Sequence, residues 1–109
     1  MSGSSERSYT GITSKEVSCE NLVFETQLAS PKEEVVAQLK RGDILDIHLD
    51  QLGGMSVVQA LWNGHVAGGI ASPQVQRLLA CLREGSTYAA EVISVLGGQV
   101  KVRIFPRLG

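Results

Sequence analysis

The side chains best suited to general-base chemistry near neutral pH are the two histidines, His48 and His65. A histidine base needs a nucleophile within hydrogen-bonding reach and a third polar group that orients its ring. His48 lies in a strand-like apolar run and His65 follows an Asn-Gly turn, so neither has such partners nearby in the sequence. We therefore predict no catalytic residues and expect that the protein is not an enzyme.

Three aspartates, Asp43, Asp46 and Asp50, form a small acidic group. Asp43 follows Gly42 and is expected to anchor a turn by accepting bonds from backbone amides. Asp46 and Asp50 would lie about 13 Å apart along a strand, too far to share a metal ion. The glycine pairs at 53–54, 68–69 and 97–98 open no helix and precede no Gly-Lys-Ser/Thr, so they predict turns or bulges rather than a phosphate loop. We expect no metal and no cofactor.

The two cysteines, Cys19 and Cys81, form no CxxC pair and no Cys/His cluster. Cys81 falls in an apolar helical pattern and is expected to be a small core residue. Cys19 lies in the polar first 20 residues with no base beside it. A reduced, cytoplasmic setting is the default for such a chain. No apolar stretch resembles a signal peptide or a spanning helix, so no membrane partner is expected.

The composition is that of one globular domain: 109 residues, 43% hydrophobic, 19% charged, with a formal net charge of -1. Residues 1–50 carry five Lys/Arg and nine Asp/Glu, whereas residues 51–109 carry five and two. This asymmetry indicates either one basic face or a chance imbalance on a solvated surface.

The pattern most suggestive of binding is the last strand-like run. Lys101, Arg103 and Phe105 alternate and so share one face of a strand, and Arg107 extends that face. Such a face can contact phosphates and stack a base, and Trp62 is a second candidate stacking platform. The alternative is that the cations protect a sheet edge and that Trp62 belongs to the core.

Local patterns predict two segments: a disordered leader over residues 1–20 and a single domain over residues 21–107. The domain alternates β-rich runs with two short helices, at 30–41 and 72–84, each opened by Ser-Pro with a Ser cap and closed by glycine. The expected fold class is α+β, a small curled antiparallel sheet or open β-barrel of about six strands. These strands are expected at residues 22–28, 44–49, 57–62, 65–70, 88–95 and 99–105.

The layout resembles the HIRAN domain, a small β-barrel found alone or attached to DNA-repair helicases. The resemblance covers about residues 22–105 as element order, and it is specific at Gly42, Asp43, Gly64, Gly68 and Ile70 and at the helix that starts near residue 72. Residues 50–56 lack the acidic-Pro-Asn stretch of that family, and the helix at 30–41 is additional. The resemblance implies binding of DNA, notably of single-stranded ends.

Two functions follow as expectations for a non-enzymatic binding module. The first is binding of single-stranded or duplex DNA through Lys101, Arg103, Phe105, Arg107 and Trp62. The alternative is a protein-interaction or self-assembly module, including a homodimer, that uses exposed strand edges and binds no nucleic acid.

Overall fold

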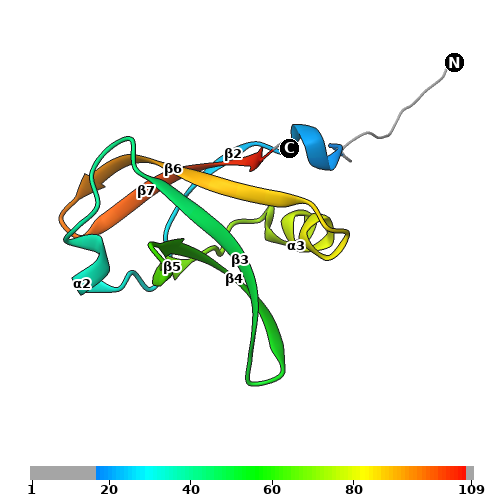
Figure 1. Ribbon diagram of the computed structural model, residues 1–109, viewed down its shortest axis with the longest axis horizontal. Helices are drawn as coiled ribbons and strands as arrows, with labels where there is room; N and C mark the ends of the chain where they lie inside the picture. Colours follow the sequence, from blue (N-terminus) through cyan, green and yellow to red (C-terminus); the bar gives the residue numbers. More distant parts are fainter. Residues whose placement is uncertain (1–16, 108–109) are drawn as a thin grey trace, which may run out of the picture.

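The computed structural model describes residues 17–107, which form an α+β fold (Figure 1). Six antiparallel strands make one curled, open sheet in the order β2-β7-β6-β3-β4-β5, so the predicted fold class is confirmed. The elements in chain order are η3 (Cys19–Asn21), β2 (Phe24–Gln27), α2 (Glu33–Val36), β3 (Ile44–Leu52), β4 (Met55–Trp62), β5 (His65–Gly69), α3 (Val75–Arg83), β6 (Thr87–Leu96) and β7 (Gln99–Arg107).

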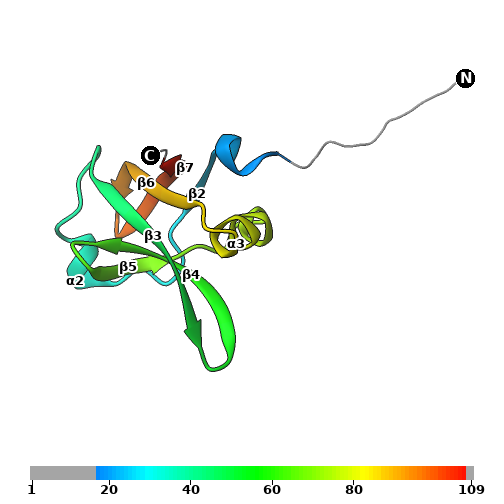
Figure 2. The same cartoon turned by 45° about the vertical axis from the view of Figure 1, so that its right-hand side comes forward.

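The hairpin turns follow from local sequence. At the β4–β5 turn, Asn63 and Gly64 have φ angles of 51° and 84°. Positive φ at both central residues matches the twist of the flanking strands, and Asn-Gly tolerates it best. The Gly-Gly pairs that join β3 to β4 and β6 to β7 also have positive φ. The turns predicted at residues 53–54, 63–64 and 97–98 are therefore confirmed, and the β3–β4 hairpin projects beyond the rest of the sheet (Figure 2).

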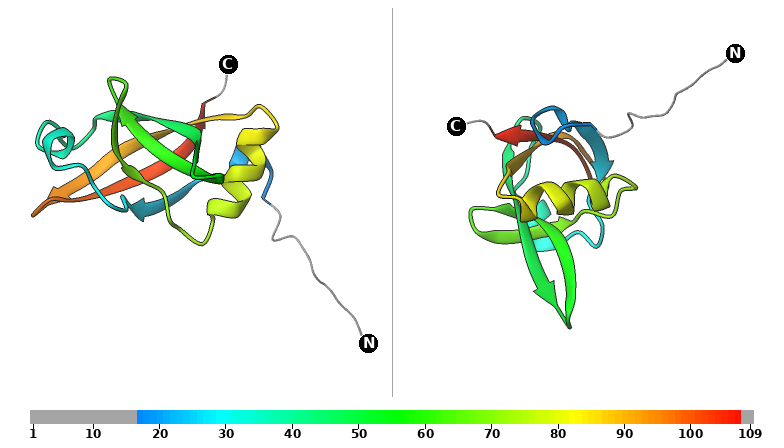
Figure 3. Two further views of the ribbon diagram at one scale, coloured as in Figure 1. Left: turned by 90° about the horizontal axis from the view of Figure 1, so that it is seen from below. Right: turned by 90° about the vertical axis from the view of Figure 1, so that its right-hand side faces the viewer.

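Strands β3 to β6 form a Greek key. Three strands connected by hairpins lie in the order β3-β4-β5, and β6 returns through α3 to lie beside β3. The segment that follows the edge strand β2 approaches the other edge strand, β5, where Ala29 and Gly69 exchange two backbone hydrogen bonds of 2.8 Å. A Cβ on Gly68 would lie 3.0 Å from the Leu28 Cβ, so this approach requires glycine. The sheet therefore curls round its core (Figure 3).

The helix predicted at residues 30–41 is much shorter in the structure. α2 spans only Glu33–Val36, and Ser30 has a φ of 47° instead of capping the helix. The reason is tertiary: the bridge at Ala29 and a 2.8 Å bond from the Lys32 N–H to the Ala67 carbonyl hold this segment along β5. The helix therefore begins at Glu33, directly after the residues that bond to β5.

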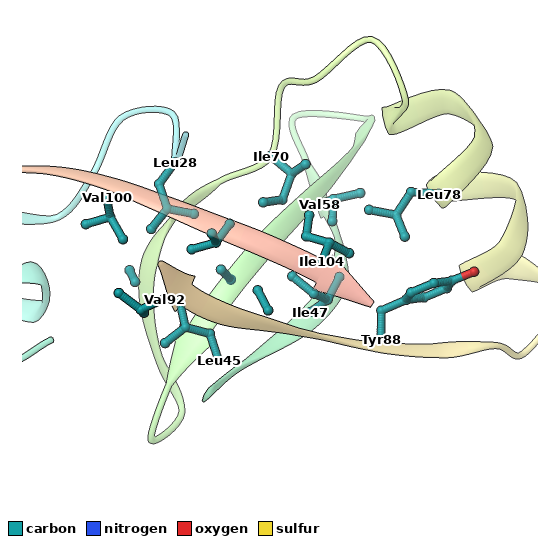
Figure 4. Close-up of a cluster of buried hydrophobic side chains, with 14 of the residues drawn as sticks. Leu28, Leu45, Ile47, Val58, Ile70, Leu78, Tyr88, Val92, Val100 and Ile104 are labelled. Carbon is teal, nitrogen blue, oxygen red and sulfur yellow. The ribbon is translucent and has the colours of Figure 1, made fainter. Parts of the chain in front are cut away.

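The second helix, α3, starts at Val75 rather than Ser72 and covers one end of the curled sheet (Figure 3). Its apolar stripe buries Leu78 and Leu79 on the sheet, as its spacing predicts, and Gly85 ends it with a φ of 102°. The core lies between α3 and the inner faces of the strands (Figure 4). Its largest fully buried side chains include Tyr88, Leu45 and Ile104.

The amino-terminal segment differs from the prediction of a disordered leader through residue 20. η3 packs beside β7, and Cys19 forms a disulfide with Cys81 of α3 across 62 residues. The Tyr88 hydroxyl also donates a 2.7 Å bond to the Cys19 carbonyl. Cys81 is fully buried as predicted. Its pairing with Cys19 was not predicted, because only the tertiary packing of η3 and α3 brings the two sulfur atoms together. Residues 1–16, the rest of the predicted leader, lie outside the described residues.

Candidate binding surfaces

The predicted basic face exists as a strand face, and its cations are paired. Lys101, Arg103 and Arg107 point away from the core on β7, and their side chains are about half exposed, at 47%, 46% and 50%. Their partners are Glu25 of β2, Glu91 of β6 and Asp46 of β3 respectively. The Lys101 Nζ lies 3.4 Å from the Glu25 carboxylate, and the Arg103 Nη2 lies 2.7 Å from the Glu91 carboxylate.

The strand register explains two of these pairs. Arg103 lies directly opposite Glu25 on one neighbouring strand and opposite Glu91 on the other. Lys101 pairs diagonally with Glu25 on the same neighbouring strand. Arg107 reaches past β6 to Asp46 of β3, so the row is neutralised within the sheet. Three cations face three carboxylates, so among residues 17–107 these pairs leave no excess of positive charge on the row. The neutralisation depends on which residues of other strands lie near β7, and the β7 sequence alone does not predict it.

The two aromatic side chains of the predicted site lie on different faces of the sheet. Phe105 is half-buried on the outer face of β7, opposite Ala89, which is fully buried. Trp62 follows Val58 and Ala60 on the inward-facing positions of β4 and packs against the core. The structure thus groups Lys101, Arg103, Phe105 and Arg107 on one face and leaves Trp62 apart from it.

A groove of about 290 Å³ lies where β4 and β5 meet residues 29–32 and the β3–β4 hairpin. Its apolar lining includes Val57, Val66 and Leu52, and Leu52 is 53% exposed. Met55, at the start of β4 beyond the Gly-Gly turn, is 68% exposed. Val57 alternates with the buried Val58 and so faces outward, while Val58 and Ile70, which belong to the core, complete the apolar lining.

The groove also has a polar margin, formed by Ser30, Lys32 and Gln59. Its lining residues include one cation, no acid and no aromatic side chain. None of the ion pairs within residues 17–107 involves Lys32. Sequence reasoning missed this groove. One signal was present: β4 has apolar residues on both faces, which an exposed outer face does not require.

The other candidate residues lie apart. His48 and His65 are both exposed, on β3 and β5. Asp43 anchors its turn as predicted, because its carboxylate accepts a 2.9 Å bond from the Lys40 N–H. Within the part of the chain that the structure describes, no three His, Cys, Asp or Glu side chains gather where they could hold a metal ion. Over the same residues, no helix has the length and apolar character needed to cross a bilayer.

Fold and surface together define a small α+β domain with a Greek-key sheet, a neutralised strand face and an apolar groove with one cation. Comparisons with protein-family models, with curated proteins and with solved structures give no match. The surfaces of the described residues therefore carry the indications of function.

Proposed function

We propose that this protein is a non-enzymatic binding module whose partner is a protein, and that the apolar groove at β4 and β5 receives a segment of that partner. The observation that carries the proposal is the outward-facing apolar lining of Leu52, Val57 and Val66. Binding sites for small ligands and for chain segments are concave and mostly apolar, with a few polar groups that fix orientation. The groove has this composition.

The position of the groove supports the same proposal. β4 and β5 are the second and third strands of the Greek key, and β7 adds a fifth strand beside β6. Small five-stranded Greek-key barrels of the OB type bind their ligands on the face of the second and third strands. Those ligands are often nucleic acids, which stack on aromatic side chains. No aromatic residue lines this groove, so its surface favours aliphatic side chains of a protein partner.

Selection of displayed random dodecapeptides on the full chain tests this proposal. We expect selected peptides to share an aliphatic residue and to lose at least tenfold in affinity to a Val57→Asp variant, because a carboxylate in the groove must be desolvated. Leu96→Asp is the matched control, since Leu96 is 75% exposed and does not line the groove. Equal binding to the wild type and to Val57→Asp would contradict the proposal. Light scattering of the chain alone measures whether it self-associates, and so whether the protein partner is a second copy of this chain.

A second candidate function is binding of single-stranded DNA through Lys101, Arg103, Phe105 and Arg107, with Trp62 as a separate platform. One observation favours it: all three cations keep about half of their surface exposed. Exposed ion pairs contribute only about 0–1 kcal/mol each, so phosphates can compete for these cations. The resemblance to the HIRAN domain points to the same function, and Gly42 and Gly64 both have the positive φ that glycine adopts most readily.

Titration of a labelled single-stranded dodecanucleotide at several salt concentrations tests this second function. Three phosphate contacts predict a slope of log K against log salt of roughly -2. A triple variant of Lys101, Arg103 and Arg107 to glutamine is expected to remove both binding and slope. Lack of binding at low salt by the wild-type chain would eliminate the DNA proposal and leave the protein-partner proposal intact.

The compartment is a separate proposal. Cysteine spacing alone predicts a reduced, cytoplasmic protein, whereas the Cys19–Cys81 disulfide favours an oxidising compartment, where such bonds persist. We propose the oxidising compartment for the folded chain. Alkylation of free thiols in intact cells, followed by mass spectrometry, tests it. Quantitative labelling of Cys19 would restore the cytoplasmic prediction.

A further inference from the structure

We infer that the groove recognises the carboxyl terminus of its protein partner, with an aliphatic last residue on the apolar floor and the terminal carboxylate at Lys32. This inference rests on the proposed function and names the partner chemistry of the same site. Three observations carry it: the charge of the lining, the volume of the groove and the placement of Lys32.

The charge of the lining calls for an anionic ligand. Lys32 is the one charged residue among those that line the groove, and no carboxylate lines it. Glu33 and Glu34, the next two residues in the chain, begin α2 and are not part of the lining. Ser30 and Gln59 add a hydroxyl and an amide, both of which can donate hydrogen bonds to a carboxylate. A ligand anion here meets one cation and two neutral donors.

The volume of the groove is sufficient for one terminal residue. The groove, at about 290 Å³, is near the lower limit of roughly 300–1,000 Å³ for sites that hold whole small ligands. This space holds one aliphatic side chain together with its own backbone. A terminal residue presents its side chain and its carboxylate from the same Cα, so both fit within this space. An internal acidic residue presents its carboxylate on a different side chain from the aliphatic anchor.

The backbone of Lys32 is held against β5 at the wall of the groove. Its N–H donates a 2.8 Å bond to the Ala67 carbonyl of β5, and the bridge between Ala29 and Gly69 holds the same segment three residues earlier. The cation thus extends from a segment tied to the groove wall, while its side chain remains exposed. Because this backbone is already ordered, the binding of an anion to Lys32 costs only the ordering of the lysine side chain itself.

Chemical-shift perturbation with three short probes tests the inference on the full chain. The probes are acetyl-Gly-Ser-Gly-Leu with a free carboxylate, the same peptide with a terminal amide, and an amidated acetyl-Gly-Ser-Glu-Leu-Gly. We expect the free acid to shift the backbone amides of Val57, Val66 and Gly69. We expect the amide probe to bind about tenfold more weakly, because the charge-assisted bond is lost. We expect the internal-Glu probe to be about as weak, because its carboxylate and its leucine side chain lie on different residues and do not reach Lys32 and the apolar floor together. Hexanoate is added as a fourth probe to represent a free aliphatic acid.

Lys32→Gln is expected to remove the preference for the free acid, and Lys101→Gln, in the matched control, is expected to keep it. Equal binding of all three peptides, unchanged by Lys32→Gln, would overturn the inference while leaving the apolar groove as a protein-binding site. Tighter binding of hexanoate than of the free-acid peptide would also overturn it. If no peptide shifts the groove amides and selection of displayed peptides also fails, the proposed function itself falls.

Discussion

Reduction of the disulfide between Cys19 and Cys81 is expected to lower the free energy of unfolding by about 4 kcal/mol. The bond closes a loop across 62 residues, and constraining a loop of that length in the unfolded chain corresponds to about 4 kcal/mol at 25 °C. Domains of this size are stable by only about 5–15 kcal/mol in total. The reduced protein is therefore expected to stay folded with a much smaller margin.

Urea unfolding of the oxidised and the reduced protein, followed by the fluorescence of Trp62, measures this difference. The comparison uses one sequence in two redox states, so no side chain is lost. A Cys19→Ser variant provides the second measurement, because Cys19 is half-buried whereas Cys81 is fully buried and stays in place. We expect this variant and the reduced protein to agree within about 1 kcal/mol.

Two results would refute the reasoning. Equal free energies of unfolding for the oxidised and reduced proteins would mean that the bond adds no constraint to the unfolded chain. A Cys19→Ser variant much less stable than the reduced protein would mean that Cys19 stabilises the fold by packing rather than by the covalent link. Either result would remove the argument from loop length.

Three further predictions concern the sheet and its closure. Gly68→Ala is expected to destabilise the protein by about 1–3 kcal/mol in thermal unfolding, because its Cβ would lie 3.0 Å from the Leu28 Cβ. Gly69→Ala, whose nearest neighbour would be 3.7 Å away, is the control and is expected to be tolerated. Burial raises the pKa of Tyr88 above 10.0, so stability is expected to fall as the pH rises above 10 and the unfolded chain loses this proton first. Unfolding measured from pH 8 to 11 checks this, and Tyr88→Phe is expected to remove the dependence. Arg103→Ala is expected to change the unfolding free energy by less than about 1 kcal/mol, since Arg103 and Glu91 are both partly exposed.

Each of these predictions has a contradicting outcome. Equal destabilisation by alanine at positions 68 and 69 would show that the close approach at Leu28 does not limit the closure of the sheet. A Tyr88→Phe variant that keeps the full alkaline loss of stability would assign that loss to other groups. A large loss in Arg103→Ala would mean that the charged row on the outer face stabilises the fold strongly.

Much of the fold could be predicted from local patterns because its turns and strands are decided by near neighbours. Asn63 and Gly64 specify a tight hairpin by their own backbone preferences, and the stripe containing Leu78 and Leu79 specifies the buried side of α3. Alternation on β7 places Lys101 and Arg103 on one face, as the sequence predicts. Each of these features depends on residues within about one turn or one strand.

The features that only tertiary structure decided depend on residues far apart in the chain. The carboxylates that neutralise Lys101 and Arg103 lie on β2 and β6, and the strand register selects them. Ser30 does not cap the predicted first helix, because the bridge between Ala29 and Gly69 of β5 holds the chain in a different conformation there. The groove and the pairing of Cys19 with Cys81 arise in the same way, since both need the sheet to curl and α3 to dock. Backbone preferences act over a few residues, whereas surface charge and shape depend on which distant segments the packed core brings together.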